Sequence, residues 1–172
     1  DTYIGDLVFK GDKVEFIPSD KTSYGLICAI EPRQNYIIRK ATKLSKQTHI
    51  IASNMDQALL IVTAVLPRTS TGFIDRFLLT CEAYHIPCIL VFNKTDLYEK
   101  ETKEYADYVK SIYEKVGYRC METSAIEKTG IEELKEVLKD KTSLLCGHSG
   151  VGKSALVNAL DSNLNLKTSS IS

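Results

Sequence analysis

The chain has 172 residues, of which 44% are hydrophobic and 26% charged, and this balance excludes a wholly disordered protein. Its 22 basic and 22 acidic residues cancel, which excludes a protein held to nucleic acid by bulk positive charge. No apolar run reaches the roughly 18 residues that a membrane span needs. The five cysteines lack the spacing of metal ligands, and we expect them to be reduced in a cytoplasmic protein.

The first forty residues predict short β-strands separated by turns. Segments rich in β-branched and aromatic residues alternate with Gly, Asp, Ser and Pro turn signals. The predicted strands are Leu7–Phe9, Val14–Ile17, Gly25–Ile30 and Tyr36–Arg39. They indicate part of a small antiparallel barrel, with fewer strands than a closed five-stranded barrel needs.

A basic run follows these strands. Between Glu31 and Asp56 the chain has no acidic residue, and its basic residues there are Arg33, Arg39, Lys40, Lys43 and Lys46. We place the domain boundary in this region, giving a β domain with its linker at residues 1–46 and a second domain at residues 47–172. The run is either a solvated linker or a contact to RNA phosphates, and the sequence leaves both interpretations open.

From residue 50 the pattern changes to strands alternating with helices. Continuous apolar runs are typical of strands buried on both faces of a sheet, and helical spacing of apolar residues fills the segments between them. The predicted strands are 58–65, 88–92, 118–123 and 142–146, and the predicted helices are 74–85, 101–116, 131–139 and 153–160. This α/β alternation predicts a mostly parallel sheet with helices on both faces.

The strongest motif matches G-x-x-x-x-G-K-[ST] between a predicted strand and a predicted helix. Its residues are Gly147, His148, Ser149, Gly150, Val151, Gly152, Lys153 and Ser154. Glycines let backbone N–H groups wrap a phosphate, and the helix presents its positive end to the anion. We expect Lys153 to reach the β- and γ-phosphates and Ser154 to bind Mg²⁺. We expect His148 to turn outward rather than to act in catalysis.

A second motif directly follows the predicted strand at 88–92, and its residues are Asn93, Lys94, Thr95 and Asp96. In a P-loop protein it predicts guanine recognition. The Asp96 carboxylate can accept from both guanine N1–H and the 2-amino group, whereas adenine would leave it unpaired. We expect the stem of Lys94 to cover the base and Asn93 to tie this turn to the phosphate loop.

A third, weaker signal is Thr123-Ser124-Ala125, at the end of the predicted strand at 118–123. The backbone N–H of Ala125 is placed to donate to guanine O6. Alone, a Ser-Ala loop is unremarkable, so its weight comes from the two stronger motifs.

Together the motifs match the guanine-nucleotide-binding set of the P-loop GTPases, but the base-reading motifs precede the phosphate loop. A circular permutation of the chain explains this order. With its β-rich N-terminal segment, the chain resembles the YjeQ/RsgA family of circularly permuted GTPases. The stretches that carry the resemblance are Val8–Val14, Asn54–Gln57, Phe73–Leu78, Asn93–Asp96 and Gly147–Ser154.

The resemblance implies an OB-fold that helps dock on ribosomal RNA, a GTPase domain with GTP, GDP and Mg²⁺ as ligands, and GTP hydrolysis stimulated by the small ribosomal subunit. It also implies a zinc-binding C-terminal domain, for which this chain carries no ligands, and a switch segment with Asp-x-x-Gly, which does not occur in the 172 residues. We therefore expect a GTPase domain that is incomplete at its C-terminus, with catalytic residues outside this sequence. Such a chain should bind GDP but hydrolyse GTP poorly. We expect a cytoplasmic monomer without membrane contact.

Alternative functions remain. The first is a GTP-hydrolysing factor in late assembly of the small (30S) ribosomal subunit, binding rRNA through the OB-like domain and Arg33–Lys46. The second is a guanine-nucleotide-gated switch acting on a non-ribosomal partner. The third is an RNA-binding protein with a vestigial nucleotide site, against which the intact Lys153, Ser154 and Asp96 argue. A P-loop ATPase is disfavoured by Asn93–Asp96.

Overall fold

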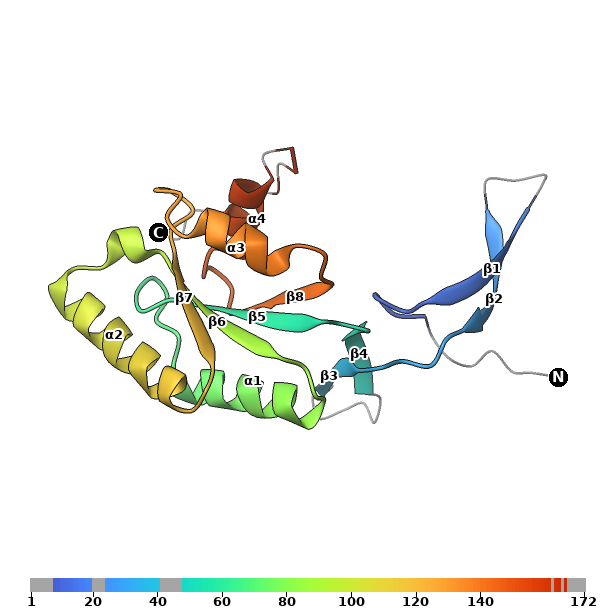
Figure 1. Ribbon diagram of the computed structural model, residues 1–172, viewed down its shortest axis with the longest axis horizontal. Helices are drawn as coiled ribbons and strands as arrows, with labels where there is room; N and C mark the ends of the chain where they lie inside the picture. The colour runs from blue at the N-terminus through green and yellow to red at the C-terminus, as the bar shows by residue number, and fades with distance from the viewer. Residues whose placement is uncertain (1–7, 20–23, 41–47, 162, 165, 167–172) are drawn as a thin grey trace. The chain divides into compact units, whose positions relative to one another are not determined.

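The structure is a computed structural model that describes residues 8–19, 24–40, 48–161, 163–164 and 166. The chain divides into two compact units, Asp1–Met55 and Asp56–Ser172, which we call unit 1 and unit 2. Unit 1 is rich in β-strands, and unit 2 contains a parallel sheet with helices (Figure 1).

Unit 1 contains two pairs of antiparallel strands. β1 (Val14–Pro18) pairs with β2 (Gly25–Ile30), and β3 (Tyr36–Lys40) pairs with β4 (Thr48–Ser53). In the described part of unit 1 the two pairs form separate two-stranded sheets rather than one sheet of a partial barrel. β4 was not expected, because its short sequence lies where the composition indicates a linker and the start of the second domain.

The expected strand over Leu7–Phe9 is wrong for Val8 and Phe9, and Leu7 lies outside the described residues. The backbone turns back here instead of extending. The N–H of Asp12 donates to the carbonyl of Phe9 at 3.1 Å, and the N–H of Phe9 donates to Asp12 Oδ2 at 2.8 Å. These reciprocal bonds close a tight turn, which satisfies the polar groups that a strand would otherwise use.

The Asp12 carboxylate organises unit 1. It accepts from Arg33 Nε at 2.7 Å, from Arg33 Nη2 at 2.8 Å and from Ser53 Oγ at 2.6 Å. The hydrogen bond from Arg33 holds the pKa of Asp12 well below its usual range. Asn35 adds a second link, with Nδ2 donating to the Met55 carbonyl at 2.7 Å and Oδ1 accepting from the Met55 N–H at 2.8 Å. Because of these contacts, unit 1 extends to Met55, beyond the boundary expected after residue 46.

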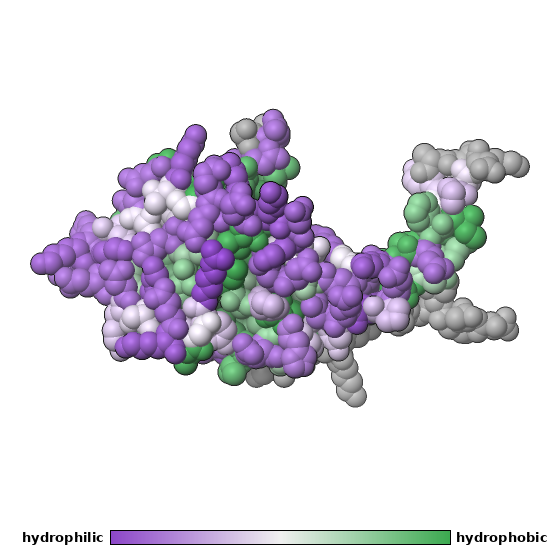
Figure 2. Space-filling view, viewed as in Figure 1, coloured by the Kyte–Doolittle hydropathy of each residue, from purple (hydrophilic) through white to green (hydrophobic). Residues whose placement is uncertain are grey.

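Large apolar side chains on β1 and β2 are exposed. Phe16, Ile17 and Leu26 keep 63%, 61% and 69% of their surface accessible. Figure 2 shows apolar surface gathered over this pair of strands. Contiguous apolar surface of this kind typically marks a place where another segment or partner docks.

Unit 2 is built on a four-stranded parallel sheet. Its strands are β5 (Gln57–Val62), β6 (Cys88–Asn93), β7 (Arg119–Thr123) and β8 (Ser143–Cys146), in the order β7-β6-β5-β8. The parallel α/β arrangement predicted from the apolar runs is confirmed. Among the paired strands described in unit 2, β5 and β8 are the farthest apart in sequence, so β8 lies beside the first strand of the sheet.

In the described residues, three α-helices and one short 3₁₀-helix lie between these strands, and a fourth α-helix follows β8. They are α1 (Thr71–Ala83), η1 (Thr95–Leu97), α2 (Lys100–Lys115), α3 (Ile131–Leu138) and α4 (Lys153–Leu160). None of the helices in the described ranges is long and apolar enough to cross a bilayer.

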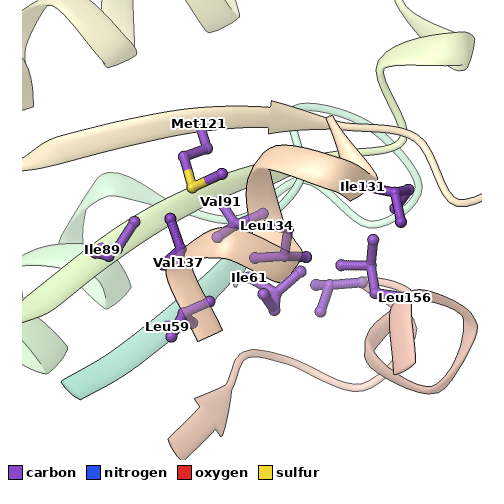
Figure 3. Packing of buried hydrophobic residues seen from close by; sticks show 10 residues of the cluster. Leu59, Ile61, Ile89, Val91, Met121, Ile131, Leu134, Val137 and Leu156 are labelled. Atoms are coloured by element: carbon purple, nitrogen blue, oxygen red, sulfur yellow. The ribbon is translucent and has the colours of Figure 1, made fainter. Parts of the chain in front are cut away.

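The core lies in two layers, one on each face of the sheet. Alternate residues of β5 point to opposite faces. Leu59 and Ile61 pack with α3 and α4, as Figure 3 shows, whereas Leu60 and Val62 pack with α1 and α2. All four side chains are at most 1% exposed. This two-sided burial holds the strands rigidly and fixes where their carboxyl ends lie.

β5 ends earlier than the predicted strand at 58–65. Beyond Val62, the N–H of Thr63 donates to Thr69 Oγ1 at 3.1 Å, and the N–H of Thr69 donates to the Thr63 carbonyl at 2.8 Å. These two bonds close a loop ahead of α1. The loop lies at the carboxyl edge of the sheet, beside the candidate site.

Candidate nucleotide-binding site

The candidate site lies where the carboxyl ends of three parallel strands meet. Open parallel sheets bind ligands at this edge. The Asn93–Asp96 turn begins at the last residue of β6, Ser124 and Ala125 follow β7, and the phosphate loop follows β8. Three segments that are far apart in the sequence therefore come to one edge.

The backbone of the phosphate loop requires glycine. Gly147, Gly150 and Gly152 have φ angles of +145°, +84° and +92°. A Cβ on Gly147 would lie 2.4 Å from the Ile61 carbonyl oxygen, and one on Gly152 would lie 2.5 Å from Asn93 Nδ2. The loop can thus take this path only without side chains at those positions.

The start of α4 is suited to an anion. Gly152 stands at the N-cap without a side-chain hydrogen bond to the helix. Lys153 Nζ donates to the carbonyls of Gly147 at 2.8 Å and His148 at 2.7 Å, so the ammonium lies over the loop. The first N–H groups of α4 and this ammonium together supply positive charge.

The other loop residues have separate environments. Val151 is fully buried in the core, whereas Ser149 is exposed and Ser154 is half-buried in the first turn of α4. The exposed imidazole of His148 packs on Phe73 of α1, with ring centroids 3.8 Å apart and planes inclined by 33°. His148 thus contacts a helix beside the loop.

Asn93 links the three segments. It is 1% exposed, its Nδ2 donates to the Val151 carbonyl at 2.8 Å, and its Oδ1 accepts from Thr123 Oγ1 at 3.0 Å. The phosphate loop and the ends of β6 and β7 are joined through this one buried side chain. Both polar ends of the buried amide therefore have hydrogen-bond partners, as buried polar groups in proteins normally do.

Lys94 has a left-handed backbone with φ of +65° and donates from Nζ to the Leu66 carbonyl. Burial lowers its pKa. A Cβ on Gly152 would lie 3.8 Å from Lys94 Cε, so the lysine stem runs beside the phosphate loop. Thr95 Oγ1 donates to the carbonyl of Thr123 at 3.2 Å and holds the turn to β7.

Ser124 orients the carboxylate of Asp96. The Ser124 hydroxyl donates to Asp96 Oδ1 at 2.5 Å and accepts from the N–H of Glu127 at 3.0 Å. Ala125 is half-buried against the core beside them. A fixed carboxylate next to a loop of backbone N–H groups has the donors and acceptors that the edge of a guanine requires.

Two side-chain contacts of the site, one made by Thr123 and one by Tyr98, were not predicted from the sequence. Thr123 precedes the Ser-Ala pair and donates to Asn93, as described above. Tyr98 donates from its hydroxyl to the Asn93 carbonyl at 3.2 Å and accepts from the Ala64 N–H at 3.4 Å. No motif marks Tyr98, because its partners are backbone groups that the fold brings together.

The residues suggested for RNA contact belong to unit 1. Arg33 is committed to the Asp12 cluster of unit 1. Arg39 and Lys40 belong to β3, but their side chains are outside the described part of the structure, as are Lys43 and Lys46 entirely.

The described residues contain no cluster of three or more His, Cys, Asp or Glu side chains suited to a metal. For Mg²⁺, the chain offers the Ser154 hydroxyl at the start of α4. This fits an ion that is held mainly by phosphate oxygens and water, with few protein ligands.

The sheet, the phosphate loop and the base-reading turns define a P-loop nucleotide-binding fold with the motif order of a circularly permuted GTPase. The chain belongs to the RsgA GTPase family, whose sequence model matches residues 30–172. The family resemblance and the circularly permuted GTPase fold expected from the sequence are therefore confirmed.

Curated relatives share most of this chain. The small ribosomal subunit biogenesis GTPase RsgA of Flavobacterium johnsoniae is 51% identical over 165 residues, covering 94% of this chain and 50% of that protein. The protein of the same name from Bacteroides fragilis is 46% identical over 162 residues, covering 94% and 52%. The chain spans about half the length of the curated relatives it matches.

Solved structures agree with this fold over nearly the whole chain. YjeQ from Thermotoga maritima matches with a TM-score of 0.77 at 39% identity, covering 95% of this chain and 54% of that chain. YloQ, described as a circularly permuted GTPase, matches with a TM-score of 0.71 at 31% identity, covering 94% and 53%.

Proposed function

We propose that this protein binds guanine nucleotides and hydrolyses GTP to GDP and phosphate as a factor in late assembly of the small ribosomal subunit. The observation that carries the nucleotide part is the buried Asn93 amide, which joins the phosphate loop at Val151 to the base-reading segments at Thr123. The ribosomal part is supported by relatives that bear the name small ribosomal subunit biogenesis GTPase.

Guanine recognition rests on Asp96. Its carboxylate accepts from guanine N1–H and the 2-amino group, while the Ser124 hydroxyl fixes its direction at 2.5 Å. The N–H of Ala125 donates to O6, and the Lys94 stem covers one face of the base. An adenine in this position leaves the carboxylate without donors, which costs the desolvation of a charged group.

Phosphate binding rests on the loop and on α4. Backbone N–H groups of the loop surround the β-phosphate, and Lys153 moves from the Gly147 and His148 carbonyls to the phosphate oxygens. Ser154 ligates the Mg²⁺, which supplies charge neutralisation on the phosphates.

Hydrolysis by P-loop GTPases consists largely of positioning an attacking water and stabilising charge. The 172-residue sequence contains no Asp-x-x-Gly, the motif expected near Mg²⁺ and the γ-phosphate. We infer that this chain by itself binds GDP well and turns GTP over slowly, with the residues that orient water contributed from outside this sequence.

Unit 1 is the proposed rRNA-binding part, acting as an OB-like domain ahead of the nucleotide-binding domain. Because Arg33 is paired with Asp12, the RNA contact rests on Arg39, Lys40, Lys43 and Lys46. Binding through such a patch weakens as salt rises. In this function the protein acts as a monomer in the cytoplasm.

The test has two arms. The 172-residue chain is titrated with GDP, GTP and ADP by calorimetry, and GTP turnover by the full-length protein is measured with small subunits, with large subunits and with neither. The proposal expects guanine-selective binding, and turnover that rises with small subunits alone. ATP in place of GTP is the control for base selectivity.

The outcomes separate the alternatives. Equal affinity for ADP and GDP would refute the guanine site. Guanine-selective binding without a rise on small subunits would instead favour a nucleotide-gated switch with a non-ribosomal partner.

A further inference from the structure

Tyr98 lies two residues beyond Asp96, at the end of η1. Its ring is half-buried and packs against the core layer formed by the sheet with α1 and α2. Burial raises the pKa of Tyr98 to about 12, so the phenol keeps its proton at neutral pH. The packed ring brings a neutral hydroxyl to the carboxyl edge of the sheet.

The hydroxyl joins the ends of two neighbouring strands. It donates to the carbonyl of Asn93, the last residue of β6, at 3.2 Å. It also accepts from the N–H of Ala64, just beyond β5, at 3.4 Å. The regular pairing of these strands ends at Val62 and Phe92. Tyr98 therefore supplies, from a side chain, the next connection between the two strands.

This connection lies at the point where the base-reading turn begins. Lys94 follows Asn93 with φ of +65°, a conformation that a residue with a Cβ adopts at a cost. The turn is closed by Leu97 N–H donating to the Lys94 carbonyl at 3.0 Å. Rotation of the peptide between Asn93 and Lys94 would swing the whole turn, including Asp96, which makes the Asn93 carbonyl the natural point to restrain.

A second contact ties the same two segments. Lys94 Nζ donates to the Leu66 carbonyl, in the loop that begins at the end of β5. The Lys94 ammonium is carried by a flexible aliphatic side chain, whereas the Tyr98 hydroxyl is carried by a ring that packs against the core. The tyrosine is thus the more rigid of the two restraints.

We propose that Tyr98 is a positioning residue for guanine selectivity, because its hydroxyl restrains the Asn93 carbonyl and so sets the direction in which Asp96 presents its carboxylate to the base. The inference rests on the proposed function. It separates two effects on Asp96: Ser124 orients the carboxylate within the turn, and Tyr98 sets the position of the turn itself.

The test compares GDP with inosine diphosphate, which lacks only the 2-amino group. The wild-type chain, Tyr98→Phe and Tyr113→Phe are titrated with both nucleotides, and the melting temperature of each is measured. Tyr113 is the matched control, because its hydroxyl donates to Asp75 Oδ1 at 2.7 Å between α1 and α2, away from the turn. Its ring is 5% exposed.

In the wild-type chain, the hydrogen bond to the 2-amino group should favour GDP by about tenfold, the effect of one hydrogen bond to a charged group. Tyr98→Phe should reduce this preference to about twofold and weaken GDP binding, while Tyr113→Phe keeps the wild-type ratio. Equal weakening for both nucleotides, or an unchanged ratio, would overturn the proposal, since Tyr98 would then only support the fold.

A second measurement needs no variant. In the wild-type chain, GDP should slow hydrogen exchange of the Ala64 N–H more than inosine diphosphate does, and equal exchange would count against the proposal. A wild-type chain that binds ADP as tightly as GDP would instead overturn the proposed function, so the two failures are distinguishable.

Discussion

Replacing Asn93 with alanine should loosen the phosphate loop and weaken nucleotide binding together. The substitution removes the donor to the Val151 carbonyl and the acceptor for the Thr123 hydroxyl, both in an environment where Asn93 itself is 1% exposed. Each buried group left without a partner costs about 1–3 kcal/mol. We therefore expect unit 2 to lose about 2–6 kcal/mol of unfolding free energy, out of the roughly 5–15 kcal/mol of a typical domain.

Part of this loss should appear in nucleotide affinity. The phosphate loop must be held in place before phosphates bind, and each 1.4 kcal/mol spent on ordering it weakens binding about tenfold. We expect GDP affinity to fall by at least about tenfold. Urea unfolding monitored by circular dichroism gives the stability, and calorimetric titration with GDP gives the affinity.

Two further variants test this explanation of the Asn93→Ala result. Thr123→Val removes only one of the two Asn93 hydrogen bonds and keeps the side-chain shape, so it should give about half of the loss in unfolding free energy. Asn35→Ala is the matched control, because Asn35 also makes two hydrogen bonds, both to Met55 in unit 1. It should destabilise unit 1 and leave GDP affinity unchanged. A folded Asn93→Ala chain that binds GDP as tightly as wild type would refute the reasoning.

Two more predictions concern strain and charge. Gly152→Ala places a Cβ 2.5 Å from Asn93 Nδ2 at φ of +92°, so GDP binding should be lost in calorimetry. Gly117→Ala has φ of +98° but open space around the Cβ, and it should keep GDP binding. The ion pair with Arg33 depresses the pKa of Asp12 in the folded state, so its contribution is complete above its ordinary pKa of about 4 and is lost as pH falls below it. Unit 1 should therefore unfold more easily in acid, and Asp12→Asn should flatten that dependence; equal pH slopes for the two proteins in urea unfolding would contradict this.

The centre of the sheet was predictable because β5 and β6 are short and buried on both faces. Runs such as Leu59–Val62 and Leu90–Phe92 contain no polar interruption, which is typical of strands covered on both faces of a sheet. β4 was not predictable in the same way. Its pairing with β3 joins residues across the basic run, as in the pair of Ile38 and Ile50, and that partnership has no local periodicity.

The motifs of the site were predictable from the sequence, but the side chains that hold neighbouring segments in place were not. The carboxyl ends of parallel strands meet at one edge, so the motifs that follow them could be placed together from the sequence. That they bind guanine and phosphate stays a prediction. The contact of Tyr98 with Ala64 and the Arg33–Asp12 pair could not be placed, because their partners are 34 and 21 residues apart and only the completed fold brings them together.

The order of strands in unit 2 also has a consequence for how the chain folds. β5, β6 and β7 are joined through neighbouring segments, whereas β8 must return to β5, and Gln57 and Ser143 on these strands are 86 residues apart. Closing so long a loop is the slow step that topology imposes. During synthesis, β5, β6 and β7 emerge before β8 and can pair before β8 and the loop after it are made. A nascent chain in which β8 has not yet docked would thus present the Asn93–Asp96 turn without the glycine-rich loop that follows β8, so the proposed nucleotide site would be assembled only when β8 joins β5.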